Sequence, residues 1–171
     1  MKSLSQFMSD IQSTLDKTHA VRKNTLKEKP KSLLYFAYGH NTYSKQFAKY
    51  CPRAKFIGVG TLKHFSMYFE EYANIRMDQG NDVKGVVWEI KAEQIKNLDG
   101  YEALHKDYNR IPVEVTVDGN EKLCITYIMD PTFEVSKIDV KPTKEYIQTV
   151  AAGYKEHGIP LEQIKTALAN S

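Results

Sequence analysis

The chain has 171 residues, of which 42% are hydrophobic and 26% charged, and its formal net charge is +3. This composition is typical of a soluble globular domain and argues against a largely disordered chain. The weak net charge and the lack of a zinc-finger or RNA-binding motif argue against a nucleic-acid-binding protein. No apolar run is long enough to span a membrane, and the N-terminus lacks the continuous apolar stretch of a signal peptide. The two cysteines, Cys51 and Cys124, are far apart, which fits a reducing cytoplasmic location.

The first 31 residues are predicted to be distinct from the rest of the chain. Apolar residues recur there at helical spacing, which predicts an amphipathic helix: Leu4, Phe7, Met8, Ile11 and Leu15. A polar, lysine-rich stretch up to Pro30 predicts a linker. The helix could dock on the domain formed by residues 32–171, form a homodimer or bind another partner. Docking is the expectation, because an exposed apolar stripe is costly.

Residues 32–171 are predicted to alternate short strands with a few helices. We expect a strand over 33–37, a helix over 43–50, paired strands over 55–62 and 64–69, and a strong strand over 83–90. Further along we expect a short helix over 92–101, strands over 111–117 and 122–129 joined by a turn at 118–120, and helices over 144–156 and 161–169. This order predicts an α+β fold with a mixed, largely antiparallel, barrel-like sheet.

The first predicted strand ends in a glycine-containing loop, Tyr38-Gly39-His40-Asn41. A glycine after a buried strand lets the backbone turn sharply and approach a ligand. Successive N–H groups of such a loop can bind an oxyanion or a carboxylate. Taken alone, the same pattern is also typical of an ordinary turn between a strand and a helix.

Two carboxylates, Asp99 and Glu102, are spaced so that they share one face of a helix. Glu102 is expected at the end of that helix, just before an irregular segment over 103–108. Functional side chains often lie at such ends, although exposed helix termini also carry many carboxylates with no role in chemistry.

Other kinds of active site find little support in the sequence. The histidines have no partner at metal-ligand spacing, so no metal site is expected. Cys51 lies near Arg53 but has no evident histidine partner, which disfavours a catalytic thiol. No phosphate-binding or dinucleotide-binding glycine motif is present.

Five segments in the same order resemble the γ-glutamylcyclotransferase superfamily, which includes the AIG2-like proteins. They are LLYFAYGHN at 33–41, VKGVVWEI at 83–90, LDGYE at 98–102, Tyr108 with Arg110, and EYIQTVAAGYKEHGIP at 145–160. The resemblance covers roughly residues 33–165 and leaves out the predicted N-terminal helix.

The resemblance implies an enzyme that cyclises a small γ-glutamyl compound to 5-oxoproline and releases an amine or amino acid, without a metal or organic cofactor. By this resemblance Glu102 is the catalytic base. The substrate-binding residues that it implies are Tyr35, Phe36, Ala37, Tyr38, Gly39, His40, Asn41 and Tyr146. Such a base must lie within hydrogen-bond reach of the substrate amine, so Glu102 should be enclosed beside the glycine loop.

Two positions depart from the family pattern. His40 stands where the family has serine or another small residue, and Ala103 stands where a glycine often follows the glutamate. The bulk of His40 leaves an alternative open, in which the pocket is filled and the chain is a non-catalytic binding or interaction protein. A third reading, a nucleic-acid-associated factor that uses the basic residues between Arg22 and Lys31, has less support.

Overall fold

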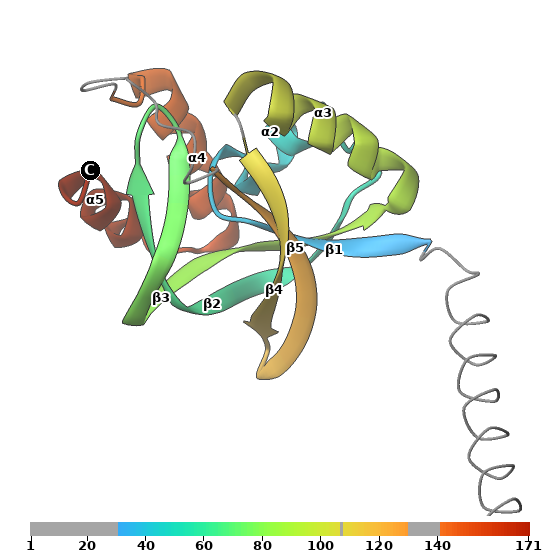
Figure 1. Ribbon diagram of the computed structural model, residues 1–171, viewed down its shortest axis with the longest axis horizontal. Helices are drawn as coiled ribbons and strands as arrows, with labels where there is room; N and C mark the ends of the chain where they lie inside the picture. Colours follow the sequence, from blue (N-terminus) through green and yellow to red (C-terminus); the bar gives the residue numbers. More distant parts are fainter. Residues whose placement is uncertain (1–30, 107, 130–140) are drawn as a thin grey trace, which may run out of the picture. The chain divides into compact units, whose positions relative to one another are not determined.

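The computed structural model describes residues 31–106, 108–129 and 141–171, and the predicted N-terminal helix lies outside these residues. Five strands form a closed barrel in the order β1-β3-β2-β4-β5 (Figure 1). Their bounds are Ser32–Ala37 (β1), Lys55–Phe69 (β2), Ala73–Lys91 (β3), Tyr108–Val117 (β4) and Asn120–Met129 (β5). Only the closing pair, β1 with β5, is parallel. The predicted α+β fold with a mixed, largely antiparallel barrel is confirmed.

The hairpin of β2 and β3 is longer than the sequence suggested. Residues 64–69 were expected to pair with 55–62, but both lie in the continuous strand β2, so this prediction was wrong. The true partner of 65–69 is the first part of β3, 73–77. Residues 73–77 do alternate between apolar and polar side chains, but the exposed, polar residues 79–82 separate them from the strand predicted over 83–90. A register shift beside His64, whose φ is 64°, interrupts the long hairpin.

The hairpin of β4 and β5 follows the predicted alternation. Val113, Val115 and Val117 are buried, and the chain reverses at Asp118 and Gly119, whose φ angles are 49° and 76°. Two consecutive positive φ values define the turn type whose twist matches antiparallel strands. Asn120 does not lengthen this turn as expected, because it already pairs with Val117.

Two glycines make room for an aromatic side chain inside the barrel. Gly60 on β2 pairs directly with Gly85 on β3. A Cβ atom at Gly85 would overlap the ring of Phe36 from β1, and one at Gly60 would overlap Val115 and Val87 and touch the same ring. Phe36 is completely buried. Strands β1, β2 and β3 thus pack together around the ring of Phe36 in the core of the barrel.

Helices lie on two sides of the barrel (Figure 1). The helical elements are η1 (His40–Thr42), α2 (Ser44–Phe47), η2 (Ala92–Gln94), α3 (Ile95–Lys106), α4 (Lys144–His157) and α5 (Glu162–Ala169). Helices α4 and α5 match their predictions closely, whereas α2 is shorter than the helix expected over 43–50. Helix α3 continues five residues beyond its predicted end, so Glu102 lies inside the helix and not at its end. Among the described residues, no helix is long and apolar enough to cross a membrane.

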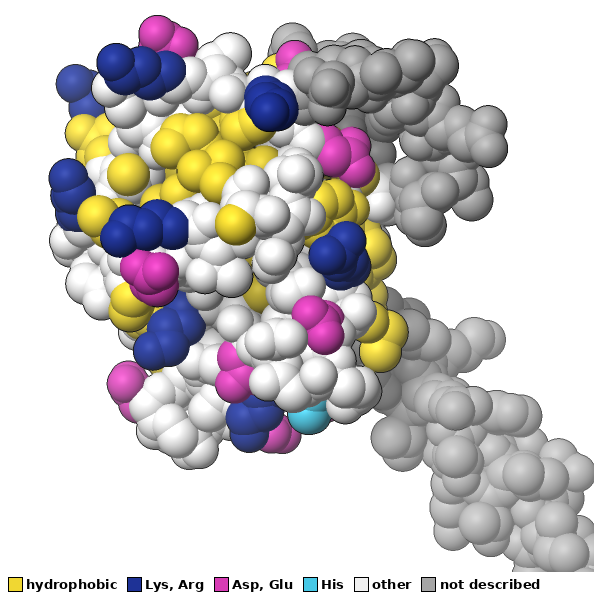
Figure 2. All heavy atoms as spheres, turned by 90° about the vertical axis from the view of Figure 1, so that its left-hand side faces the viewer, with side chains coloured by type: hydrophobic (Ala, Val, Ile, Leu, Met, Phe, Trp, Pro, Cys, Tyr) yellow, Lys and Arg dark blue, Asp and Glu magenta, His cyan; other side chains and the backbone are white. Residues whose placement is uncertain are grey.

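Figure 2 shows the face of the molecule that lies on the left in Figure 1. Lys and Arg side chains on this face are interspersed with Asp, Glu and apolar side chains and do not form one continuous patch. The expectation that the chain has no nucleic-acid partner remains a prediction.

Candidate active site

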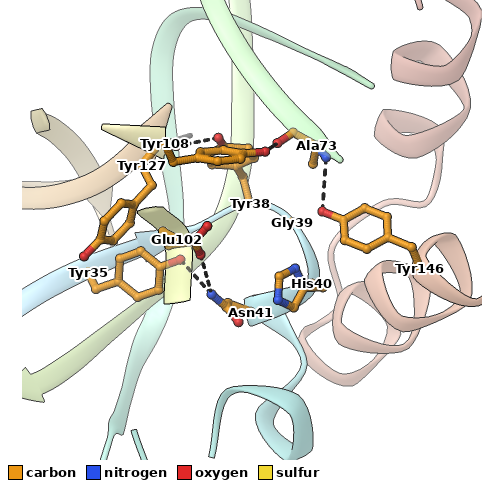
Figure 3. Close-up of a pocket in the computed structure, with 10 residues that line it drawn as sticks. All are labelled: Tyr35, Tyr38, Gly39, His40, Asn41, Ala73, Glu102, Tyr108, Tyr127 and Tyr146. Atoms are coloured by element: carbon orange, nitrogen blue, oxygen red, sulfur yellow. Dashed lines mark hydrogen bonds between the residues drawn. The ribbon is translucent and has the colours of Figure 1, made fainter. Parts of the chain in front are cut away.

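A pocket lies where the glycine loop, helix α3 and helix α4 meet the barrel (Figure 3). It contains about 280 Å³ of space, part of it open to solvent. Its lining residues are Tyr35, Tyr38, Gly39, His40, Asn41, Ala73, Glu102, Tyr108, Tyr127 and Tyr146. Seven of the nine residues implied by the resemblance therefore meet at one place, although they come from three separate stretches of the chain.

Glu102 is enclosed, with only 4% of its surface exposed. Its Oε1 atom lies 3.3 Å from the Nδ2 atom of Asn41, which donates a hydrogen bond to it. The same Nδ2 atom donates to the hydroxyl of Tyr35 at 3.2 Å. The carboxylate is thus beside the glycine loop and away from bulk solvent, which is the placement that a catalytic role requires.

Asn41 is fixed by its backbone as well as by its side chain. Its carbonyl oxygen accepts a hydrogen bond of 3.0 Å from the indole of Trp88, and the residue is 3% exposed. Among the residues that the structure describes, the amide Oδ1 atom, in contrast, has no hydrogen-bond partner and is itself buried. Buried polar atoms are nearly always paired, so this acceptor is an exception.

Close packing requires glycine at position 39. A Cβ atom there would lie 3.1 Å from the hydroxyl of Tyr146 and 3.2 Å from the Cβ of Ala73. The Tyr146 hydroxyl itself accepts a hydrogen bond of 3.1 Å from the Ala73 amide. The side chain of Thr42 donates to the Gly39 carbonyl at 2.7 Å and closes the turn. The loop backbone therefore approaches the pocket at a site where a larger residue would crowd Tyr146 and Ala73.

Helix α4 holds the glycine loop from the other side. The Tyr154 hydroxyl donates to the carbonyl of Tyr38 at 2.8 Å. Nearer the end of α4, Glu156 accepts hydrogen bonds from the amide and the hydroxyl of Ser44, at the start of α2. Burial acts to raise the pKa of Glu156, but the bonds from Ser44 outweigh it and lower that pKa. A lowered pKa indicates an ionised carboxylate that fastens α2 to α4.

Tyrosines make up half of the residues that line the pocket. Burial is the largest cause that raises the pKa of Tyr35, Tyr38 and Tyr108 well above the usual value, and the charge of Glu102 adds to it. These phenols therefore remain protonated donors at neutral pH. Tyr38 donates to the carbonyl of Tyr127 at 2.6 Å, and Tyr108 donates to the carbonyl of Ala73.

Three of the lining residues were not predicted as site residues: Ala73, Tyr108 and Tyr127. Tyr108 could have been found, because it belongs to a segment that carries the family resemblance. Nothing in the local sequence marks as a site residue either Ala73, for whose stretch no element was predicted, or Tyr127, which lies in the strand predicted over 122–129.

Phe36 and Ala37 were expected at the substrate site, but the structure does not bring them to the pocket wall. Successive side chains of a strand point to opposite faces. Tyr35 of β1 faces the pocket, and Phe36 faces the barrel interior against Gly60 and Gly85. Ala37 is buried and its carbonyl faces Gly85.

His40 forms part of the pocket wall without filling the pocket. Its ring packs edge-on against the rings of Tyr101 and Tyr146, and its Nε2 atom is 3.2 Å from the Tyr101 hydroxyl. The larger side chain is thus accommodated between two tyrosines.

Neither cysteine has the character of a catalytic thiol. Burial raises the pKa of Cys51 and of Cys124 to about 11, so both are protonated near neutral pH. Neither lines the pocket. Within the described part of the chain, no group of three or more His, Cys, Asp or Glu residues is arranged to hold a metal ion.

Comparison with known proteins identifies the family to which the chain belongs. A family model described as "Gamma-glutamyl cyclotransferase, AIG2-like" matches residues 35–148, which is well over half of the chain. The chain belongs to this family. The resemblance seen in the sequence is thereby confirmed.

Individual relatives and solved structures are similar to this chain in sequence and in fold. A γ-glutamylcyclotransferase from Bos taurus is 33% identical over 149 residues, covering 78% of this chain and 76% of the bovine protein. The crystal structure of an uncharacterised protein from Homo sapiens has a TM-score of 0.69 at 30% identity and covers 80% of this chain and 86% of the human one. A solved γ-glutamyl cyclotransferase has a TM-score of 0.67 at 29% identity, with 78% and 85% covered.

Proposed function

We propose that this protein is a γ-glutamylcyclotransferase that converts a γ-glutamyl compound into 5-oxoproline and a free amine or amino acid, with Glu102 as the catalytic base. The observation that carries the proposal is the enclosed Glu102 carboxylate, which lies in one pocket with the glycine loop. Membership of the family and its named enzymes support the same conclusion.

The first chemical step is a proton transfer. The α-amino group of a γ-glutamyl compound is largely protonated at neutral pH and cannot attack a carbonyl. Glu102 removes one proton when the ammonium group lies within hydrogen-bond reach of its carboxylate. The hydrogen bond from Asn41 Nδ2 supports this assignment, because it holds the Glu102 carboxylate in place within the pocket.

Ring closure follows within the substrate. The free amine forms a bond to the γ-carbonyl carbon, and the carbonyl π electrons move onto oxygen. Holding the two groups in attacking geometry can contribute about 7–11 kcal/mol in favourable systems. Among the described residues, the amide of Gly39 donates to no acceptor, so it is suited to stabilise the developing oxyanion. When the tetrahedral intermediate collapses, Glu102 gives its proton to the leaving nitrogen, the bond to that nitrogen breaks, and the ring nitrogen passes its remaining extra proton to the released amine.

The pocket also favours the enzyme over the non-catalytic alternative. That alternative requires the His40 side chain to fill the pocket. Instead, His40 packs against Tyr101 and Tyr146, and a pocket that is partly open to solvent still reaches Glu102.

The test is to measure 5-oxoproline release from γ-glutamyl dipeptides, γ-glutamylamines and glutathione. We expect release from at least one of these, and a loss of roughly 10²–10⁴-fold in kcat for Glu102→Gln, since a general base typically contributes that much. Glu121→Gln, an exposed change on β5, is the matched control and should retain activity.

Thermal unfolding of each variant separates lost chemistry from lost structure. Release that survives Glu102→Gln would show that another group is the base. No release from any compound by the unaltered protein would contradict the proposed reaction.

A further inference from the structure

Helix α3 carries Glu102 and is held by apolar and polar contacts, among them the ring of Tyr101, which packs against Tyr50 and His40. Leu98 is completely buried, and Ile95 packs partly against the core. One turn before Glu102, the carboxylate of Asp99 provides a polar attachment, because residues three apart share a helical face.

Asp99 joins α3 to two neighbouring strands at once. Its Oδ1 atom accepts a hydrogen bond of 2.5 Å from the hydroxyl of Tyr127 on β5. The Nη1 atom of Arg110 on β4 donates to both carboxylate oxygens, at 3.0 and 2.8 Å. Arg110 and Tyr127 are direct partners in the β4–β5 ladder. The Asp99 carboxylate therefore fixes helix α3 against the Arg110–Tyr127 pair of the β4–β5 ladder.

Tyr127 connects Asp99 to the pocket, because it both donates a hydrogen bond to Asp99 and lines the pocket. This residue is 4% exposed and lines the pocket, and its ring packs edge-on against that of Tyr35. Its carbonyl accepts the hydrogen bond from Tyr38, the first residue of the glycine loop. Burial, and next the hydrogen bond to Asp99, raise the pKa of Tyr127, so its hydroxyl stays protonated and donates to the carboxylate.

We infer that Asp99 is a positioning residue, which sets Glu102 and the Tyr127 side of the pocket in the geometry that the reaction needs. The inference rests on the proposed function. It does not assign Asp99 a direct contact with substrate. The Asp99–Arg110 pair is a poor candidate for a purely stabilising role, because both side chains are about 40% exposed and exposed ion pairs contribute little to stability.

The experiment compares Asp99→Ala, Asp99→Asn and Tyr127→Phe with the unaltered protein. We expect kcat for Asp99→Ala to fall about 10- to 100-fold, the loss typical of a misplaced catalytic group, while KM changes less than about threefold. Asp99→Asn keeps an acceptor for Tyr127 and should recover part of kcat. In the double variant Asp99→Ala with Tyr127→Phe, kcat should fall by less than the product of the two single fold-changes, because both substitutions remove the same contact.

Glu93→Ala is the matched control. It breaks an ion pair with Arg53 just before α3, and both of these side chains are 64% exposed and outside the pocket lining. The control should leave kcat unchanged. An Asp99→Ala variant that behaves like this control, or one whose loss of kcat matches the fraction of unfolded protein in the sample, would overturn the inference.

Hydrogen exchange of the α3 amides provides a readout that does not depend on activity. Asp99→Ala should speed exchange in α3 relative to Glu93→Ala, and unchanged exchange would contradict the positioning role. If the unaltered protein releases no 5-oxoproline, the proposed reaction fails, whereas the exchange data still decide whether Asp99 holds the helix.

Discussion

At the scale of single residues, Asn41 connects the parts of the pocket more directly than any other side chain described here. Its amide nitrogen donates to both Glu102 and Tyr35, and its carbonyl oxygen accepts from Trp88. The sequence suggested a backbone role for the loop, through its N–H groups. The structure adds the side chain of Asn41, which orients the carboxylate proposed as the base.

We predict that Asn41→Leu, a change of similar size, lowers kcat/KM by roughly 10- to 150-fold, since a hydrogen bond to a charged group is worth about 1.5–3 kcal/mol. The measurement is 5-oxoproline release at several substrate concentrations. Asn81→Leu, on the exposed part of β3, is the control. Equal activity of the two variants would mean that Asn41 neither orients Glu102 nor contacts substrate.

At the scale of elements, the fit of helix α4 against η1 holds the glycine loop in place. Gly153 faces Thr42 and Tyr43 so closely that a Cβ atom would overlap both residues. The sequence predicted the helix itself, from its periodicity and from the glycine that ends it. It did not predict that an internal glycine, usually unfavourable in a helix, allows this contact.

We predict that Gly153→Ala destabilises the protein by about 1–3 kcal/mol, the usual cost of overpacking. The same substitution at Gly100 in α3, where an added Cβ meets no atom within 4 Å, should stabilise by roughly 0.5–1 kcal/mol through helix propensity. Chemical denaturation of both variants measures the difference. Equal effects of the two changes would show that the contact between α4 and η1 can relax.

At the scale of the whole molecule, the barrel closes through the one parallel pairing, between β1 and β5. This closure brings Tyr35 beside Tyr127 and places the end of β1, with its loop, against β5. The described core and pocket lie entirely within Ser32–Ser171. This part of the chain therefore has the contacts that an independent domain needs.

We predict that a shortened chain of residues 32–171 folds on its own and unfolds within about 4 °C of the full chain, a shift of about 1–2 kcal/mol at this size. It should also keep its rate of 5-oxoproline release. Light scattering on both chains tests whether residues 1–31 form a homodimer. An insoluble or unfolded shortened chain would contradict the predicted domain boundary.

The sequence by itself determined the features that depend on neighbouring residues. Periodicity and turn chemistry were enough for the β4–β5 hairpin, for helices α4 and α5, and for the glycine loop, and the motifs in order were enough for the family. Only the tertiary structure decided the long partnership of β2 with β3, the orientation of Phe36 into the barrel, and the contributions of Ala73 and Tyr127 to the pocket. These features depend on strand register and barrel closure, which are set by contacts between residues far apart in the chain, and local patterns do not encode them.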